Sequence, residues 1–314
     1  MPDPGILPGP REDPAEVRAR AWLAFLALGI IWGLPYFFIK LAVRELSPFD
    51  VAWGRITLAA LILLPIAWRR GALRPLATHK AAVFAFATVE FAIPFSTIST
   101  GERWIPSSVT GILLATVPLT IALISRFFGV HERLGAVRLT GLAVGLGGVV
   151  ALVGFGTLSG ALAWAGVSCV LVATVCYAVG GLIIQKHLHA VDSIGPVAAS
   201  LTIASLLLLA PAMLSLPRRL PSAVALSSVA VLGLICTALS MLLMFYLVKN
   251  AGASRASIVT YINPAVATLL GVALLDERLG VGGMIGFGLI LVGSWLATHG
   301  SVPSAEVAAV EASS

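Results

Sequence analysis

Charged residues are scarce in this 314-residue sequence, in which Asp, Glu, Lys and Arg together make up 11% of the chain. A soluble globular domain carries about 25% charged residues, so this chain lacks the polar surface that such a domain needs. Hydrophobic residues make up 59%, and the mean hydropathy is +1.01. They occur in runs close to the roughly 20 residues with which a helix crosses a bilayer. The composition therefore predicts an all-α polytopic membrane protein.

The sequence also lacks the motifs of a disulfide-bonded, metal-binding or catalytic protein. Its three cysteines lie inside apolar runs, and its five histidines lie in loops or at the ends of those runs. It contains no HExxH, no CxxC and no glycine-rich phosphate loop. The glycine-rich stretch at 141–156 is wholly apolar, which is typical of a helix-packing face. We therefore expect no cofactor, no metal and no enzymatic activity.

Ten apolar runs are long enough to be membrane spans, and short connections separate them. The polar segments 1–21 and 300–314 are predicted to be disordered tails. The predicted spans are 22–43, 49–68, 80–100, 105–127, 136–154, 161–185, 194–214, 223–247, 254–274 and 281–298.

Lysine and arginine in the loops predict the orientation, because cytoplasmic loops of membrane proteins carry an excess of both. If the N-terminus is cytoplasmic, the loops on that side hold 13 of these residues and the loops on the other side hold 6. We therefore predict a bacterial-type inner-membrane protein with both termini in the cytoplasm. The net charge of +6 comes from such loops, so nucleic acid is not an expected partner.

The sequence ERLG occurs twice, at 132–135 and 277–280, and other landmarks repeat in nearly the same register. Chance alignment of Leu- and Gly-rich helices would not place prolines, charges and loop lengths in one register. We therefore predict two five-helix repeats, 22–154 and 161–299, in which the ERLG residues either cap turns or act in gating. A shift of 146 residues places Lys40 on Lys186, Ser47 on Ser193, Pro65 on Pro211, Arg103 on Lys249 and Pro118 on Pro264.

Each predicted repeat has five spans, and five is an odd number. The second repeat must therefore enter the membrane from the opposite side, which gives an inverted pair. Inverted repeats are typical of transporters, whose substrate site lies near the midplane between the two repeats.

The sequence resembles the EamA-type drug/metabolite transporter superfamily over about residues 22–299. The resemblance rests on ten helices as five plus five, on WGLPYFFIK in the first span, on a proline in spans 4 and 9, and on ERLG before a glycine-rich last helix. It is closest in kind to YddG-type exporters of aromatic and other neutral amino acids. It implies a cavity lined by spans 1, 3, 4, 6, 8 and 9. The small four-helix relatives couple to protons through a Glu in span 1, and this sequence has no acid there.

Two charges lie at membrane depth, where each costs about 2.5–3.5 kcal/mol on insertion scales. Glu90 lies near the middle of the third predicted span, and Arg55 lies about two turns into the second. Glu90 is either an amine or proton site or a neutral partner in a helix–helix hydrogen bond. Arg55 either binds a substrate carboxylate or reaches outward to pair with Asp50 or Glu45.

Aromatic and amide side chains form a further set of candidate substrate-binding residues, because a polar group in mid-membrane needs a partner. They either line the cavity or pack in the core. The set comprises Trp32, Tyr36, Tyr177, Tyr246, Tyr261 and Asn263.

Four mid-span prolines are candidate hinges for alternating access: Pro35, Pro94, Pro118 and Pro264. Proline frees the carbonyl four residues before it, which must find a partner in lipid. For Pro118 this predicts an exposed carbonyl at Leu114, facing a cavity or another helix. Static kinks are the alternative.

An aromatic site with one carboxyl and one arginine suits a zwitterion, so we predict export of small neutral metabolites such as aromatic amino acids. The chain is expected to act as a monomer in the lipid bilayer on a small-molecule substrate. Export of lipophilic cations, a lipid-modifying enzyme and a scaffold are the alternatives. Transport is expected to proceed without a covalent step and without obligatory proton exchange. In a rival version, Glu90 carries the proton.

Overall fold

The computed structural model describes residues 14–125, 136–154, 160–251, 259 and 262–299, and its regular elements are helices. Their bounds in the first half are α1 Pro14–Ala42, α2 Pro48–Arg69, η1 Arg74–Thr78, α3 Lys80–Phe86, η2 Ala87–Ala92, α4 Ile93–Gly101, α5 Ser107–Leu114, α6 Val117–Ile124 and α7 Ala136–Gly154. In the second half they are α8 Ala161–Ile183, η4 Ile184–Leu188, α9 Ile194–Leu214, α10 Ala223–Gly233, η5 Leu234–Leu239, α11 Ser240–Ala251, α13 Asn263–Leu274 and α14 Val281–His299.

Seven helical runs in the described part of the chain are long and apolar enough to cross a membrane. Three shorter apolar helices, Leu139–Leu152, Asn263–Leu274 and Val281–Ala297, fall within the predicted spans 5, 9 and 10. The first of the long runs, Trp22–Ala42, agrees with the predicted span 22–43. Helix α1 itself begins earlier, at Pro14, within the segment predicted to be a disordered tail, because proline is favoured in the first turn and good helix formers follow it.

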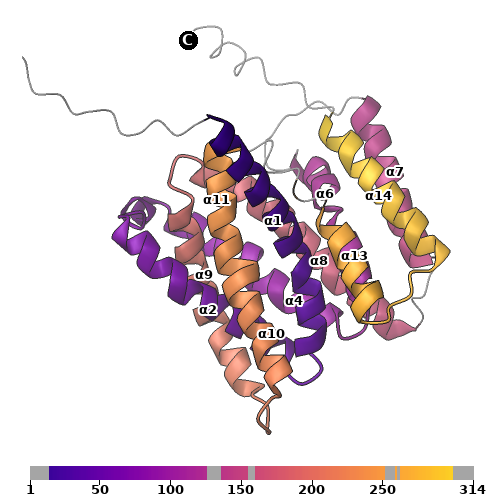
Figure 1. Cartoon of the computed structure of the whole chain (residues 1–314), viewed down its shortest axis with the longest axis horizontal. Helices are drawn as coiled ribbons and strands as arrows, with labels where there is room; N and C mark the ends of the chain where they lie inside the picture. The colour runs from indigo at the N-terminus through magenta and orange to yellow at the C-terminus, as the bar shows by residue number, and fades with distance from the viewer. Residues whose placement is uncertain (1–13, 126–135, 155–159, 252–258, 260–261, 300–314) are drawn as a thin grey trace, which may run out of the picture.

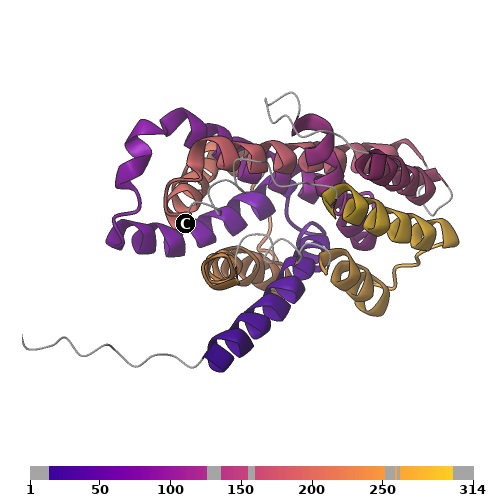
Figure 2. The same cartoon turned by 90° about the horizontal axis from the view of Figure 1, so that it is seen from above.

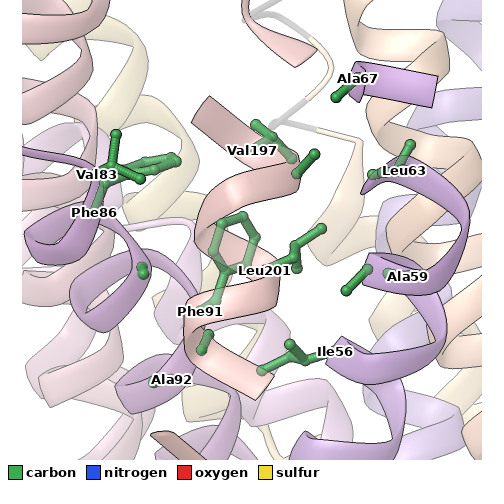
Figure 3. Packing of buried hydrophobic residues seen from close by; sticks show 14 of the residues in the cluster. Ile56, Ala59, Leu63, Ala67, Val83, Phe86, Phe91, Ala92, Val197 and Leu201 are labelled. Atoms are coloured by element: carbon green, nitrogen blue, oxygen red, sulfur yellow. The ribbon is translucent and has the colours of Figure 1, made fainter. Parts of the chain in front are cut away.

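The largest buried cluster joins the two halves of the chain through α2 and α9, which pack along each other (Figure 1). Figure 3 shows Val197 and Leu201 of α9 pointing towards Ile56, Ala59 and Leu63 of α2. These residues are apolar and closely spaced. Dispersion contacts of this kind hold helices together where lipid offers no hydrophobic driving force.

Helices α7 and α14 lie side by side at one edge of the molecule (Figures 1 and 2). Their contact is made by glycines, as the glycine-rich stretch predicts. A Cβ atom added to Gly148 would lie 2.8 Å from both the Gly286 carbonyl oxygen and the Ile290 nitrogen. No side chain fits there, so the two backbones touch directly.

The helix boundaries themselves repeat along the chain. Helix α6 begins at Val117, and α13 begins at Asn263, which is 146 residues later. The π-helical segments η2 and η5 begin at Ala87 and Leu234, 147 residues apart. Both start positions match the register of the sequence landmarks within one residue.

Candidate functional site

Arg55 is a buried cation in the interior of the bundle, with 7% of its surface exposed. Its Nε donates a hydrogen bond to Thr237 Oγ1 at 2.8 Å, and its guanidinium carbon lies 3.9 Å from the centre of the Phe95 ring. The expected pairing with Asp50 or Glu45 is not what the structure has, because Asp50 accepts from the Ser47 backbone at 3.1 Å and Glu45 accepts from Ser222. Arg55 therefore lacks a carboxylate partner among the described residues.

Two tyrosines from different helices flank this arginine. Tyr36 of α1 and Tyr177 of α8 pack against one apolar cluster that includes Ile98 and Cys236. Arg55 interacts electrostatically with both tyrosines. The structure thus brings together three of the predicted site residues, from α1, α2 and α8.

Glu90 lies on η2, a π-helical turn within the third span. Such turns are rare and occur often at functional sites. The Glu90 carboxylate packs against Gly180 of α8 and interacts electrostatically with Tyr177. Tyr177 therefore interacts with both Arg55 and Glu90. That the two oppositely charged groups serve one site stays a prediction.

Replacing Gly180 by Ala should impair transport more than it impairs stability. The new methyl group would collide with the Glu90 carboxylate, which is the free end of a flexible side chain and can turn away. Gly181→Ala is the matched control, since its nearest neighbour would be Ile121 Cδ1 at 3.9 Å. We expect at least a several-fold loss of substrate flux for Gly180→Ala, with a Tm close to that of Gly181→Ala. Equal substrate flux in the two variants would mean that Glu90 is not part of the substrate site.

Trp32 lies one turn before Tyr36 on α1, and Tyr246 lies on α11. Trp32 and Tyr246 pack against the cluster of Leu28, Leu247 and Val259. Asn263, at the start of α13, places its carbonyl oxygen against Gly33 of α1, and its Oδ1 is buried without a partner among the described residues. Tyr261 lies outside the described residues. A single cavity shared by Trp32, Glu90, Tyr177 and Asn263 stays a prediction.

The mid-span prolines coincide with helix breaks at three of the four positions. Pro118 and Pro264 are the second residues of α6 and α13, where a missing N–H costs little, and Pro94 follows the π turn η2. Pro35 differs, because α1 continues through it. The break before Pro118 leaves the Ala115 carbonyl to accept a hydrogen bond from Ser294 of α14 at 2.9 Å. A freed carbonyl was expected one residue earlier, at Leu114. Hinge motion itself stays a prediction.

The second ERLG motif connects the two halves of the chain. Glu277, in the turn between α13 and α14, accepts four hydrogen bonds from the first residues of α5. The backbone N–H and hydroxyl of Ser107 bind its Oε1 at 2.7 and 2.9 Å, and those of Ser108 bind its Oε2 at 2.9 and 2.6 Å. A carboxylate at a helix N-terminus satisfies free N–H groups and is favoured by the helix dipole. Glu132 of the first motif lies outside the described residues.

Two more polar contacts between the halves lie at the same end of the bundle. We call this end the distal face; it comprises residues 40–48, 101–108, 215–222 and 275–280. The connection 215–222, before α10, lies at the bottom of Figure 1. The Ser222 hydroxyl and backbone N–H donate to the Glu45 carboxylate at 2.6 and 2.7 Å, and the Ser47 and Ser215 hydroxyls lie 2.7 Å apart. The bonds from Ser222 lower the pKa of Glu45, so this contact persists at neutral pH and is lost only in acid.

Lys40 and Glu102 are two charged residues of the distal face that carry little or no exposed surface. The Lys40 ammonium donates to the carbonyl oxygens of Glu102 at 2.5 Å and Ile105 at 2.8 Å, which stabilises the turn after α4. The Glu102 side chain is fully buried, and neither carboxyl oxygen has a hydrogen-bond partner among the described residues. Burial raises the pKa of Glu102 well above its ordinary value.

The sequence did not single out Lys40 and Glu102 as site residues, and it did not predict that Glu277 binds the start of α5. All three lie in or next to predicted loops, where charges are ordinary. Glu102 adjoins Arg103, which is exposed, so nothing in the sequence separates the two. The one available signal was that Lys40 falls inside the last turn of a predicted span.

Comparison with known proteins identifies the family. Two segments, residues 19–154 and 164–298, each match the profile of the EamA-like transporter family. The chain is 30% identical over 283 residues to the uncharacterized inner membrane transporter YedA of Escherichia coli (strain K12), covering 88% of this chain and 90% of YedA. An uncharacterized transporter of Archaeoglobus fulgidus is 26% identical over 288 residues, which cover 88% of this chain and 98% of that protein. Uncharacterized transporter YoaV of Bacillus subtilis is 23% identical over 285 residues, with 89% and 97% covered.

One crystal structure shares the fold, with a TM-score of 0.63 at 20% sequence identity over 91% of this chain and all of that one. The fold and these relatives define a polytopic membrane transporter. The chain belongs to the EamA-like transporter family of the drug/metabolite transporter superfamily, and it is a transporter and not an enzyme.

Proposed function

We propose that this transporter exports small neutral metabolites, in the first place aromatic and hydrophobic amino acids, by alternating access between two inverted five-span repeats. The observation that carries the substrate class is Arg55, a buried guanidinium without a carboxylate partner among the described residues. A planar guanidinium binds a carboxylate through two parallel hydrogen bonds. A buried cation that the fold leaves unpaired is therefore suited to a substrate carboxylate.

Glu90 completes a site for a zwitterion. Glu90 and Arg55 both interact electrostatically with Tyr177, so a substrate near Tyr177 could bind Glu90 through its α-amino group and Arg55 through its carboxylate. Tyr36 and Tyr177 offer aromatic surface for an apolar side chain. Lipophilic cations fit this arrangement less well, because Arg55 repels them.

The topology part of the proposal has ten spans with both termini in the cytoplasm of a bacterial-type inner membrane. It is supported by two matches to one family profile, by repeated helix starts, and by the loop charges. YedA is described as an inner membrane transporter. The distal face is then periplasmic, and its three contacts between the halves close the protein on that side.

The test is uptake of labelled amino acids into liposomes that hold the purified protein. Saturable uptake of Phe, Tyr or Leu above that of empty liposomes supports the proposal, and competition by unlabelled amino acids ranks the substrates. Uptake of a lipophilic cation without any amino acid would assign the protein to drug export instead.

A further inference from the structure

We propose that Glu102 is a proton-dependent switch for opening the distal face of this transporter, holding a proton while that face is closed and releasing it when the face opens. The inference rests on the proposed function, since it concerns the opening of the distal face in the same alternating-access cycle. It adds a second titratable carboxyl to Glu90, which the rival version of the transport mechanism makes the proton carrier.

The Glu102 carboxyl is neutral while the distal face is closed. Its side chain has no exposed surface, and its two oxygens have no hydrogen-bond partner in the described part of the chain. A buried ionised carboxylate without hydrogen bonds is costly, and protonation removes that cost. The closed arrangement therefore favours the neutral acid.

Charged side chains from three segments interact electrostatically with Glu102. Lys40 of α1 has the largest effect, followed by Glu277 from the turn after α13 and Arg55 of α2. Each of them is already engaged: Lys40 by two backbone carbonyls, Glu277 by two serines and Arg55 by Thr237 and Phe95. Helix α8, which packs on Gly101 through Gly166, Val170 and Cys169, brings no charge.

Opening of the distal face and deprotonation of Glu102 depend on each other. Opening the distal face must break the bonds between Glu277 and Ser107 and Ser108, which lie in the same turn region as Glu102. Water then reaches Glu102, and the carboxyl loses its proton to that water. The new carboxylate attracts Lys40 away from the carbonyl oxygens of Glu102 and Ile105 that it holds in the closed state. Deprotonation and opening therefore favour each other.

The sign of the pH dependence follows. Because the closed state binds the proton more tightly than the open state, raising the pH favours opening. One proton per opening changes the ratio of open to closed by up to about tenfold per pH unit, between the pKa of the open state and that of the closed state.

The direct test uses spin labels on Arg103→Cys and Arg278→Cys, two exposed positions on either side of the Glu277 contact. The native Cys169, Cys176 and Cys236 are replaced by Ala. The distance distribution is measured between pH 5 and pH 9 by pulsed electron paramagnetic resonance. We expect a longer-distance population that grows with pH, and Glu102→Gln should remove this growth because it mimics the protonated acid. Glu102→Asp should restore it, and Glu45→Gln, on the same face, should leave it unchanged.

A pH response that survives in Glu102→Gln, or a wild type that stays closed throughout, would overturn the inference. A liposome assay adds the functional readout. Wild-type flux should depend on the pH at the distal face, and Glu102→Gln should lose this dependence while exchange of labelled for unlabelled substrate continues. Glu90→Gln should lower the flux, because Glu90 belongs to the proposed substrate site, but the remaining flux should keep its dependence on pH. Loss of the pH dependence in Glu90→Gln alone would assign the role to Glu90. If no amino acid is transported but the distance still depends on pH and on Glu102, the substrate proposal fails and this one stands.

Discussion

Arg55→Gln should abolish amino-acid transport and leave the folded protein at least as stable as the wild type. The guanidinium is buried, and its described contacts are one hydroxyl and one aromatic ring. A charge in mid-membrane costs about 2.5–3.5 kcal/mol on insertion scales, which Thr237 and Phe95 offset only in part. Removing the charge removes that cost, so the fold does not depend on it.

The substrate does depend on it under the proposed function. Truncating one partner of a buried charged pair costs about 2–5 kcal/mol, which corresponds to a loss of affinity of roughly 30-fold to several thousandfold. The measurements are labelled uptake into liposomes and Tm in detergent. Arg55→Lys keeps the charge without the planar fork and should be intermediate in uptake.

Arg69→Gln is the matched control, because Arg69 is an exposed arginine on the same helix. It should change neither uptake nor Tm. If Arg55→Gln unfolds the protein, the arginine is a structural partner of Thr237 and Phe95. If uptake persists at the wild-type level, the carboxylate site is elsewhere.

The membrane class and the matching helix starts could be predicted from the sequence because both depend on patterns that the backbone obeys directly. Apolar runs form spans, and Pro118 and Pro264 fall where α6 and α13 begin. Gly148 and Gly286 meet because only glycine allows two backbones to touch. Such features require no knowledge of which helices are neighbours.

The partners of individual polar groups could not be predicted, because they come from distant parts of the chain. Pairing with Asp50 or Glu45 was one of the alternatives for Arg55, yet it bonds to Thr237, 182 residues away. Glu277 was predicted either to cap its own turn or to act in gating, and it binds a helix in the other half. Glu102 gave no signal at all, since burial of a loop residue depends on what packs over it.

Among substitutions on the distal face that exchange a single atom, as Glu→Gln does, Glu277→Gln should destabilise that face most. The substitution replaces one acceptor oxygen by an amide nitrogen, which then meets N–H and O–H donors of Ser107 or Ser108. Hydrogen bonds to charged groups contribute about 1.5–3 kcal/mol each, and a buried donor left without a partner adds a similar cost. We therefore expect a loss of about 3 kcal/mol and a clear fall in Tm.

The control is Glu45→Gln, the other carboxylate that binds a serine N–H and hydroxyl across the halves. Glu45 is exposed, so water replaces its lost bonds and the Tm should hardly change. Loss of the Glu277 contact should also populate the longer spin-label distance between positions 103 and 278 at low pH, where the wild type is closed. Equal Tm values for the two variants would mean that the hydrogen bonds of Glu277 do not contribute to the stability of the fold. A fall in Tm without the longer distance would mean that it stabilises the helices and does not hold the face shut.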